Sequence, residues 1–146
     1  MRSTYVIGLA CLLAALYLIF IWPVQKVLRS FDNLESNARH VITGTQLQEW
    51  AVRLLTFPPT NSTPRVSQLG TNFPAQLLGL YRHPPYIYIQ EAGTNSPGYV
   101  RLIWGSGFMG HCGFEIGSTN FVSYRPNEQA WQPGVYFWSD SAKRRR

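Results

Sequence analysis

The chain has 146 residues, of which 45% are hydrophobic and 14% are charged. This length fits one small domain plus a terminal segment, and the hydrophobic content excludes a chain that is disordered throughout. The net charge of +6 belongs largely to a basic tail, whose residues are Lys143, Arg144, Arg145 and Arg146. Without this tail, nine basic residues stand against seven acidic ones, and no nucleic-acid partner is expected. The tail itself could contact anionic lipid headgroups or remain in solvent.

The first predicted element is a helix across an apolar run near the N-terminus. Residues 5–22 read YVIGLACLLAALYLIFIW and contain no charged side chain. A helix needs roughly 20 apolar residues to cross the hydrocarbon core of a bilayer. The run therefore predicts a transmembrane anchor over residues 1–23, which contacts the lipid bilayer through residues 4–22. Tyr5 and Trp22 lie near its ends, where amphipathic aromatic rings favour the headgroup region.

Two other interpretations of this run stay open. A cleaved signal peptide is disfavoured because bulky residues end the run and no small-residue cleavage pair follows. A lipoprotein would be acylated on Cys11, but apolar sequence precedes this residue only briefly and continues long after it. The basic residues that flank the run are Arg2 on one side and Lys26 and Arg29 on the other. This count slightly favours a membrane protein whose C-terminal domain is cytoplasmic.

Two further helices are predicted before the first strand. Apolar residues at spacings of three and four predict a juxtamembrane helical segment within residues 24–43. A second amphipathic helix is predicted over residues 45–55, with Thr45 as its N-cap. Residues 58–74 are rich in Pro, Thr, Asn and Ser and predict a loop, followed by a short helical turn within residues 74–81.

Five short strands are predicted in the second half of the chain. Stretches rich in β-branched and aromatic residues alternate there with segments rich in turn-forming residues. The expected strands cover residues 86–90, 99–104, 112–116, 121–124 and 135–138. The pattern predicts an α+β domain over residues 44–142, in which one or two helices pack on an antiparallel β-meander of about five strands. Residues 143–146 form the basic tail.

One glycine-flanked segment, residues 110–117, could carry chemistry. It places His111, Cys112 and Glu115 close together in the sequence. Its last seven residues resemble the histidine strand of NlpC-type papain-like peptidases, which runs His-x-Gly-apolar-x-apolar-Gly. That family pairs this strand with a nucleophilic cysteine elsewhere in the chain, whereas the only other cysteine here is Cys11, within the apolar run. The resemblance therefore lacks the residue that would make it catalytic.

The leading functional hypothesis is a single-pass membrane protein whose domain binds an unidentified protein partner or supports a membrane complex without catalysing a reaction. The histidines and cysteines lack the paired spacing of a zinc site, so neither a metal nor another cofactor is expected. The alternative is a membrane-tethered thiol hydrolase in which Cys112 acts with a histidine. A third hypothesis is that small residues pack anchor helices together; they are Gly8, Ala10, Ala14 and Ala15.

Overall fold

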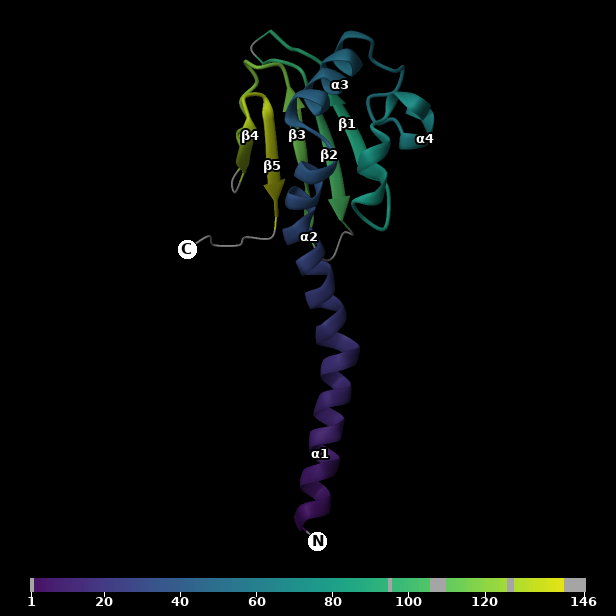
Figure 1. Ribbon diagram of the computed structural model, residues 1–146, viewed down its shortest axis with the longest axis vertical. Helices are drawn as coiled ribbons and strands as arrows, with labels where there is room; N and C mark the ends of the chain where they lie inside the picture. Colours follow the sequence, from purple (N-terminus) through teal and green to yellow (C-terminus); the bar gives the residue numbers. More distant parts are fainter. Residues whose placement is uncertain (1, 95, 106–109, 126–127, 141–146) are drawn as a thin grey trace.

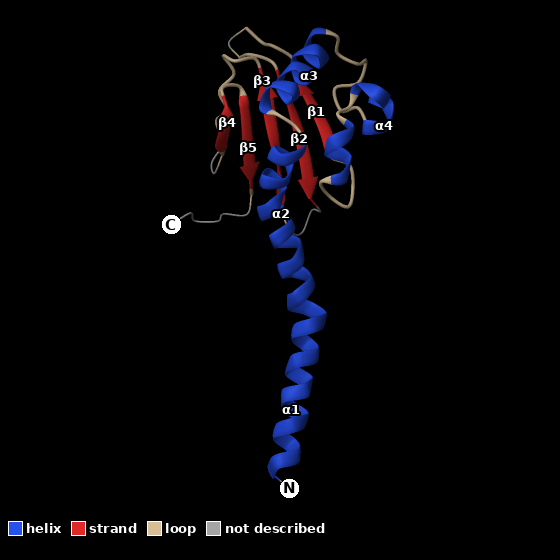
Figure 2. Ribbon diagram, in the orientation of Figure 1, coloured by secondary structure: helices blue, strands red, loops and turns tan. Residues whose placement is uncertain are grey.

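A computed structural model of the chain describes residues 2–94, 96–105, 110–125 and 128–140 (Figure 1). A long N-terminal helix projects from a small domain, in which further helices lie over one face of an antiparallel sheet (Figures 1 and 2). The predicted α+β class and the five-stranded antiparallel sheet are confirmed. Several predicted element boundaries differ from the structure by one or two residues, and one predicted strand is wrong.

The N-terminal helix is continuous from the first described residue into the domain. It consists of α1 (Arg2–Leu16), the π-helical turn η1 (Tyr17–Ile21) and α2 (Trp22–Val41). Pro23 accounts for the π-helical turn, because it has no N–H to donate and its ring crowds the carbonyl one turn earlier. Taken one by one, none of the helices among the described residues is both long enough and apolar enough to cross a membrane.

The C-terminal turns of α2 belong to the core of the domain. Leu34 and Ala38 lie on one helix face and are completely buried, and Ile42 follows them directly after the helix. Of these residues only Leu34 belongs to the stripe predicted for the juxtamembrane segment, and the side chains of its other members, Val24, Val27, Leu28 and Phe31, lie outside the described part of the chain. The segment continues the N-terminal helix beyond the π-helical turn and ends inside the domain.

The second domain helix, α3 (Gly44–Thr56), lies across the strands β2 (Tyr99–Gly105), β3 (His111–Gly117) and β5 (Val135–Ser139). Its N-cap is Thr43, so the prediction of Thr45 is wrong by two residues. Thr43 has an extended backbone, its hydroxyl accepts a hydrogen bond from the Gln46 N–H, and the Gln46 side chain accepts one from the Thr43 N–H. This reciprocal capping box satisfies two N–H groups that a helix start otherwise leaves open.

The segment between α3 and the sheet is more ordered than the predicted loop. It contains α4 (Val66–Leu69), the 3₁₀ turn η2 (Gly70–Asn72) and the 3₁₀ turn η3 (Ala75–Gly79). The last of these confirms the short helical turn predicted within residues 74–81. Three apolar side chains hold the segment against the core; they are Leu69, Phe73 and Leu77.

The strands of the sheet are β1 (Tyr86–Gln90), β2 (Tyr99–Gly105), β3 (His111–Gly117), β4 (Gln129–Gln132) and β5 (Val135–Ser139). They lie in the order β1-β2-β3-β5-β4 with antiparallel pairing throughout. The predicted meander is therefore wrong at its end, because β3 pairs with β5 and β4 lies at the edge. The strand predicted over residues 121–124 is wrong, because these residues hydrogen-bond into no ladder. The remaining strand of the sheet is instead β4, an irregular edge strand that was not predicted from the sequence.

The inner face of the sheet, beneath α2 and α3, is apolar. Alternate residues of β1, β2, β3 and β5 supply its side chains, which are all buried: Ile87, Ile89, Val100, Leu102, Trp104, Cys112, Phe114, Ile116, Val135 and Phe137. Burial of this apolar area is the main favourable term in folding the domain. The outer face carries the intervening residues, and it is there that the charged side chains of the sheet lie.

Candidate functional site

The structure separates the two residues on which thiol chemistry would depend. Cys112 has an exposed fraction of 0% and lies on the inner face of the sheet, in register with Trp104. His111 is its neighbour along β3, so its side chain points to the other face. There the His111 Nδ1 lies 3.4 Å from the Asp140 Oδ2, and both side chains are substantially exposed. Thiol and imidazole are therefore not paired as nucleophile and base.

The third predicted residue, Glu115, belongs to a charged cluster on the outer face. It has an exposed fraction of 3%. Its Oε1 accepts hydrogen bonds from Arg101 Nε at 2.7 Å and Arg125 Nε at 2.8 Å, while Ser123 Oγ donates to Oε2 at 2.7 Å. A buried carboxylate needs such partners to offset the loss of hydration. Because both of its carboxylate oxygens accept hydrogen bonds, Glu115 links β3 to Arg101 on β2 and to the segment that carries Ser123 and Arg125.

The partners of Glu115 fasten residues 121–125 across the outer face. Arg125 lies over the Trp138 ring at 4.2 Å, and Phe121 stacks on Tyr99 with ring centroids 5.0 Å apart. Tyr136 also donates a hydrogen bond to the Phe121 carbonyl at 3.2 Å. Cation–π and aromatic contacts of this kind add to the ion pairs. This arrangement gives the polar cluster a structural role.

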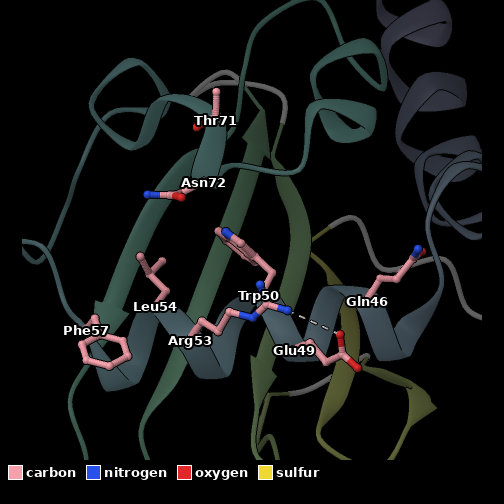
Figure 3. Close-up of a pocket in the computed structure, with 8 residues that line it drawn as sticks. All are labelled: Gln46, Glu49, Trp50, Arg53, Leu54, Phe57, Thr71 and Asn72. Carbon is pink, nitrogen blue, oxygen red and sulfur yellow. Dashed lines mark ion pairs between the residues drawn. The ribbon is translucent and has the colours of Figure 1, made fainter.

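A first hollow lies beside α3, with a volume of about 490 Å³. Figure 3 shows the Trp50 side chain standing between α3 and the segment that carries Thr71 and Asn72. Arg53 and Glu49 form an ion pair of 3.8 Å at its rim, so the charges there largely cancel. The hollow is therefore polar at its rim but offers little net charge to a ligand.

A second, larger hollow of about 1080 Å³ follows the β1 side of the domain. We call it the edge groove. It is lined by Thr63, Pro64, Arg65, Val66, Ser67, Leu78, Tyr81, Arg82, His83, Pro84, Pro85, Tyr86, Ile87, Tyr88, Arg101, Ile103, Trp104 and Gly105. These residues come from α4 and its preceding loop, from the segment between η3 and β1, and from β1 and β2. Elements far apart in the sequence therefore build one groove.

The charge of the edge groove is positive, and none of its lining residues is acidic. Arg101 is engaged by Glu115, as described above. Arg65 and Arg82 are exposed, and neither has an ion pair with any carboxylate in the described part of the chain. His83 lies beside Arg82 in the lining. Two guanidinium groups are thus available to a ligand.

The free edge of β1 is partly occupied beside the groove. The Ile89 N–H donates a hydrogen bond to the Ser62 carbonyl at 2.8 Å, and Pro64, two residues after Ser62, is buried. The loop before α4 therefore engages one of the backbone groups that an edge strand presents. A ligand in the groove would meet the side chains that line it.

The groove residues were not predicted from the sequence, which singled out residues 110–117 instead. Comparison with known proteins adds no relative: the chain matches no protein-family model, and no curated protein or solved structure is detectably similar to it. Among the described residues, no three His, Cys, Asp or Glu side chains gather as a metal site would require. The geometry of the groove and of the N-terminal helix therefore carries what can be inferred about function.

Proposed function

We propose that this protein is a single-pass membrane protein whose domain binds a partner through the edge groove. The observation that carries the binding half is the combination of a groove of about 1080 Å³ with two arginines that have no carboxylate partner among the described residues. Binding sites are concave and combine apolar walls with a few placed polar groups. Tyr86, Pro84 and Pro85 supply such walls here.

The N-terminal helix supports the membrane half of the proposal. α1 and η1 project away from the domain (Figure 1). Large apolar side chains along them are exposed; they are Ile7, Leu12, Leu13, Leu16, Tyr17, Leu18, Ile19, Phe20, Ile21 and Trp22. Exposed apolar surface of this extent is uncommon on a soluble domain and marks a surface that another medium or molecule covers. A bilayer would cover it on every side of the helix.

The thiol-hydrolase alternative has no specific observation in its favour. Cys112 is fully buried, and His111 points to the other face of the sheet. The contact of the basic tail with anionic lipid stays a prediction, because residues 143–146 lie outside the described residues. The cytoplasmic orientation of the domain and the packing of anchor helices through Gly8, Ala10, Ala14 and Ala15 likewise stay predictions.

The membrane half is tested by alkaline extraction of membranes from cells that express the full chain with a C-terminal tag. We expect the chain to remain in the membrane pellet, and Leu13→Arg/Ile19→Arg to release it, because each arginine costs about 2.5–3.5 kcal/mol at the centre of a spanning helix. Protease digestion of the tag before and after cell lysis shows on which side of the membrane the domain lies. Release of the unchanged chain at alkaline pH would contradict the anchor.

The binding half is tested by replacing Tyr86, in the edge groove, with a photoreactive amino acid in living cells. We expect one discrete crosslinked adduct from this position. The same replacement at Val122, which is exposed but lies outside the groove lining, serves as the control and should give none. Equal labelling from both positions, or no adduct from either, would contradict binding through the groove.

A further inference from the structure

We infer that the occupant of the edge groove is an extended acidic segment of a partner polypeptide. This inference deepens the proposed function and rests on it for the location of the site. Three features of the groove lead to it: its unbalanced charge, its size, and the hydrogen bond that the loop before α4 already makes to β1.

The charge of the groove selects an anionic ligand. The structure pairs Arg39, Arg53 and Arg125 with carboxylates at 2.9, 3.8 and 2.8 Å. Arg65 and Arg82 break this pattern in the described residues and line the same hollow. Guanidinium groups bind carboxylates through paired hydrogen bonds, which makes an acidic side chain a suitable partner.

The size of the groove favours a polypeptide over a small anion. A volume of about 1080 Å³ lies at the upper end of what small-molecule sites occupy, roughly 300–1,000 Å³. The lining extends from Arg65 to the end of β2 at Gly105 and includes the half-buried Tyr88. A carboxylate ion would fill only a small part of it, whereas an extended chain would contact both the arginines and the aromatic walls.

The mode of binding follows from the backbone groups beside the groove. Since Ser62 already accepts a hydrogen bond from the Ile89 N–H, an additional strand could not pair with β1 at this residue. Pro84 and Pro85 also have no backbone N–H to offer. The segment would therefore be held by its side chains, with acidic groups on Arg65 and Arg82 and apolar groups on Tyr86, which is 73% exposed.

The test is a selection from displayed random twelve-residue peptides on the full chain, held in nanodiscs of neutral phosphatidylcholine. We expect the enriched peptides to be acidic. Their affinity, measured by fluorescence anisotropy, should fall about tenfold or more with Arg65→Glu/Arg82→Glu, because both charges that attract the peptide are reversed. Raising the salt from about 0.05 to 0.3 M should also weaken binding.

Two matched variants control the selection. Arg65→Lys/Arg82→Lys keeps both charges and should retain most of the affinity. Arg53→Glu changes an exposed arginine in the hollow beside α3 and should leave the affinity unchanged within about twofold. All of these arginines are exposed, so the variants are expected to fold, which circular dichroism would verify.

The inference is overturned by neutral or basic peptides, by no enrichment, or by acidic peptides that bind Arg65→Glu/Arg82→Glu as well as the unchanged chain. If such a result accompanied a persistent adduct from position 86 in cells, the acidic segment would be wrong while the proposed function stood. If the adduct were also missing, both would fall. Competition by millimolar inorganic phosphate alone, at full strength, would point to a small-anion site and equally overturn the inference.

Discussion

Phe114 and Glu115 are neighbours in β3, yet they stabilise opposite faces of the sheet by different means. Phe114 is completely buried among aromatic rings, with Phe137 and Trp131 at centroid distances of 5.4 and 5.7 Å. Glu115 is nearly as buried but is held by hydrogen bonds from charged groups. The inner face thus gains free energy from area removed from water, whereas the outer face depends on directional contacts that fix one crossing segment.

The largest effect is expected for a substitution at Gly113, which would disrupt both faces of the sheet at once. Gly113 lies next to Phe114, and a Cβ at this position would collide with the backbone carbonyl of Leu102. Because a carbonyl within a ladder cannot move without disrupting β2, we expect Gly113→Ala to lower the free energy of unfolding by more than about 4 kcal/mol or to prevent folding. Urea denaturation of the full chain in detergent, followed by tryptophan fluorescence, measures this. A loss below about 1 kcal/mol would contradict the close strand approach.

The inner face alone is tested by Phe114→Ala. Removing a fully buried ring leaves a cavity, and we expect the free energy of unfolding to fall by about 3–5 kcal/mol. Urea denaturation again gives the value, and Phe114→Leu provides the control, since it retains most of the volume and should cost markedly less. Equal losses for the two variants would show that the ring is not packed as described.

The outer face alone is tested by Glu115→Ala, which leaves two arginines without their carboxylate. Loss of one partner from a buried pair costs about 3–5 kcal/mol, but Arg101 and Arg125 keep some contact with water, so we expect about 2–3 kcal/mol. Limited proteolysis should also show faster cleavage near residues 121–125. If cleavage there were unchanged, the charged cluster would not be what holds this segment.

The smallest effect is expected for the N-cap of α3, a contact that belongs to neither face of the sheet. Thr43→Ala removes the side-chain half of the capping box at the start of α3. We expect a loss of about 1 kcal/mol in the free energy of unfolding, as is typical of an N-cap. Thr45→Ala, at the position that the sequence analysis favoured, should cost clearly less. A larger loss for Thr45→Ala than for Thr43→Ala would show that Thr45 is the N-cap.

The sequence predicts those elements whose pattern arises from the sheet or helix itself. In β1 and β2 buried residues alternate with more exposed ones, because one face of each strand is buried, and the sequence of β2 shows this alternation. Residues 121–124 show the same alternation of burial for another reason. Phe121 stacks on Tyr99 and Ser123 donates a hydrogen bond to Glu115, so both side chains face the sheet without entering a ladder. Periodicity alone cannot distinguish these two origins.

The misses have equally local causes. β4 has only Trp131 and Ala130 as apolar residues, and a register shift between Ala130 and Gln132 interrupts its pairing, so it lacks a strand signature. The candidate groove depends on Arg65, Arg82 and the end of β2, which no local pattern connects. The opposite orientation of Cys112 and His111, by contrast, follows from strand geometry alone and agrees with the register.

The unbroken course of the N-terminal helix has a mechanical consequence. Between Trp22 and the buried Leu34 the helix runs for about 18 Å without a loop, and its far end is fixed in the core through Leu34 and Ala38. No loop separates the domain from the apolar end of the helix, so the orientation of the domain follows the direction of the helix after Trp22. A tilt or rotation of this part of the helix therefore also changes the orientation of the edge groove. The π-helical turn at Tyr17–Ile21 is the irregular point of the helix.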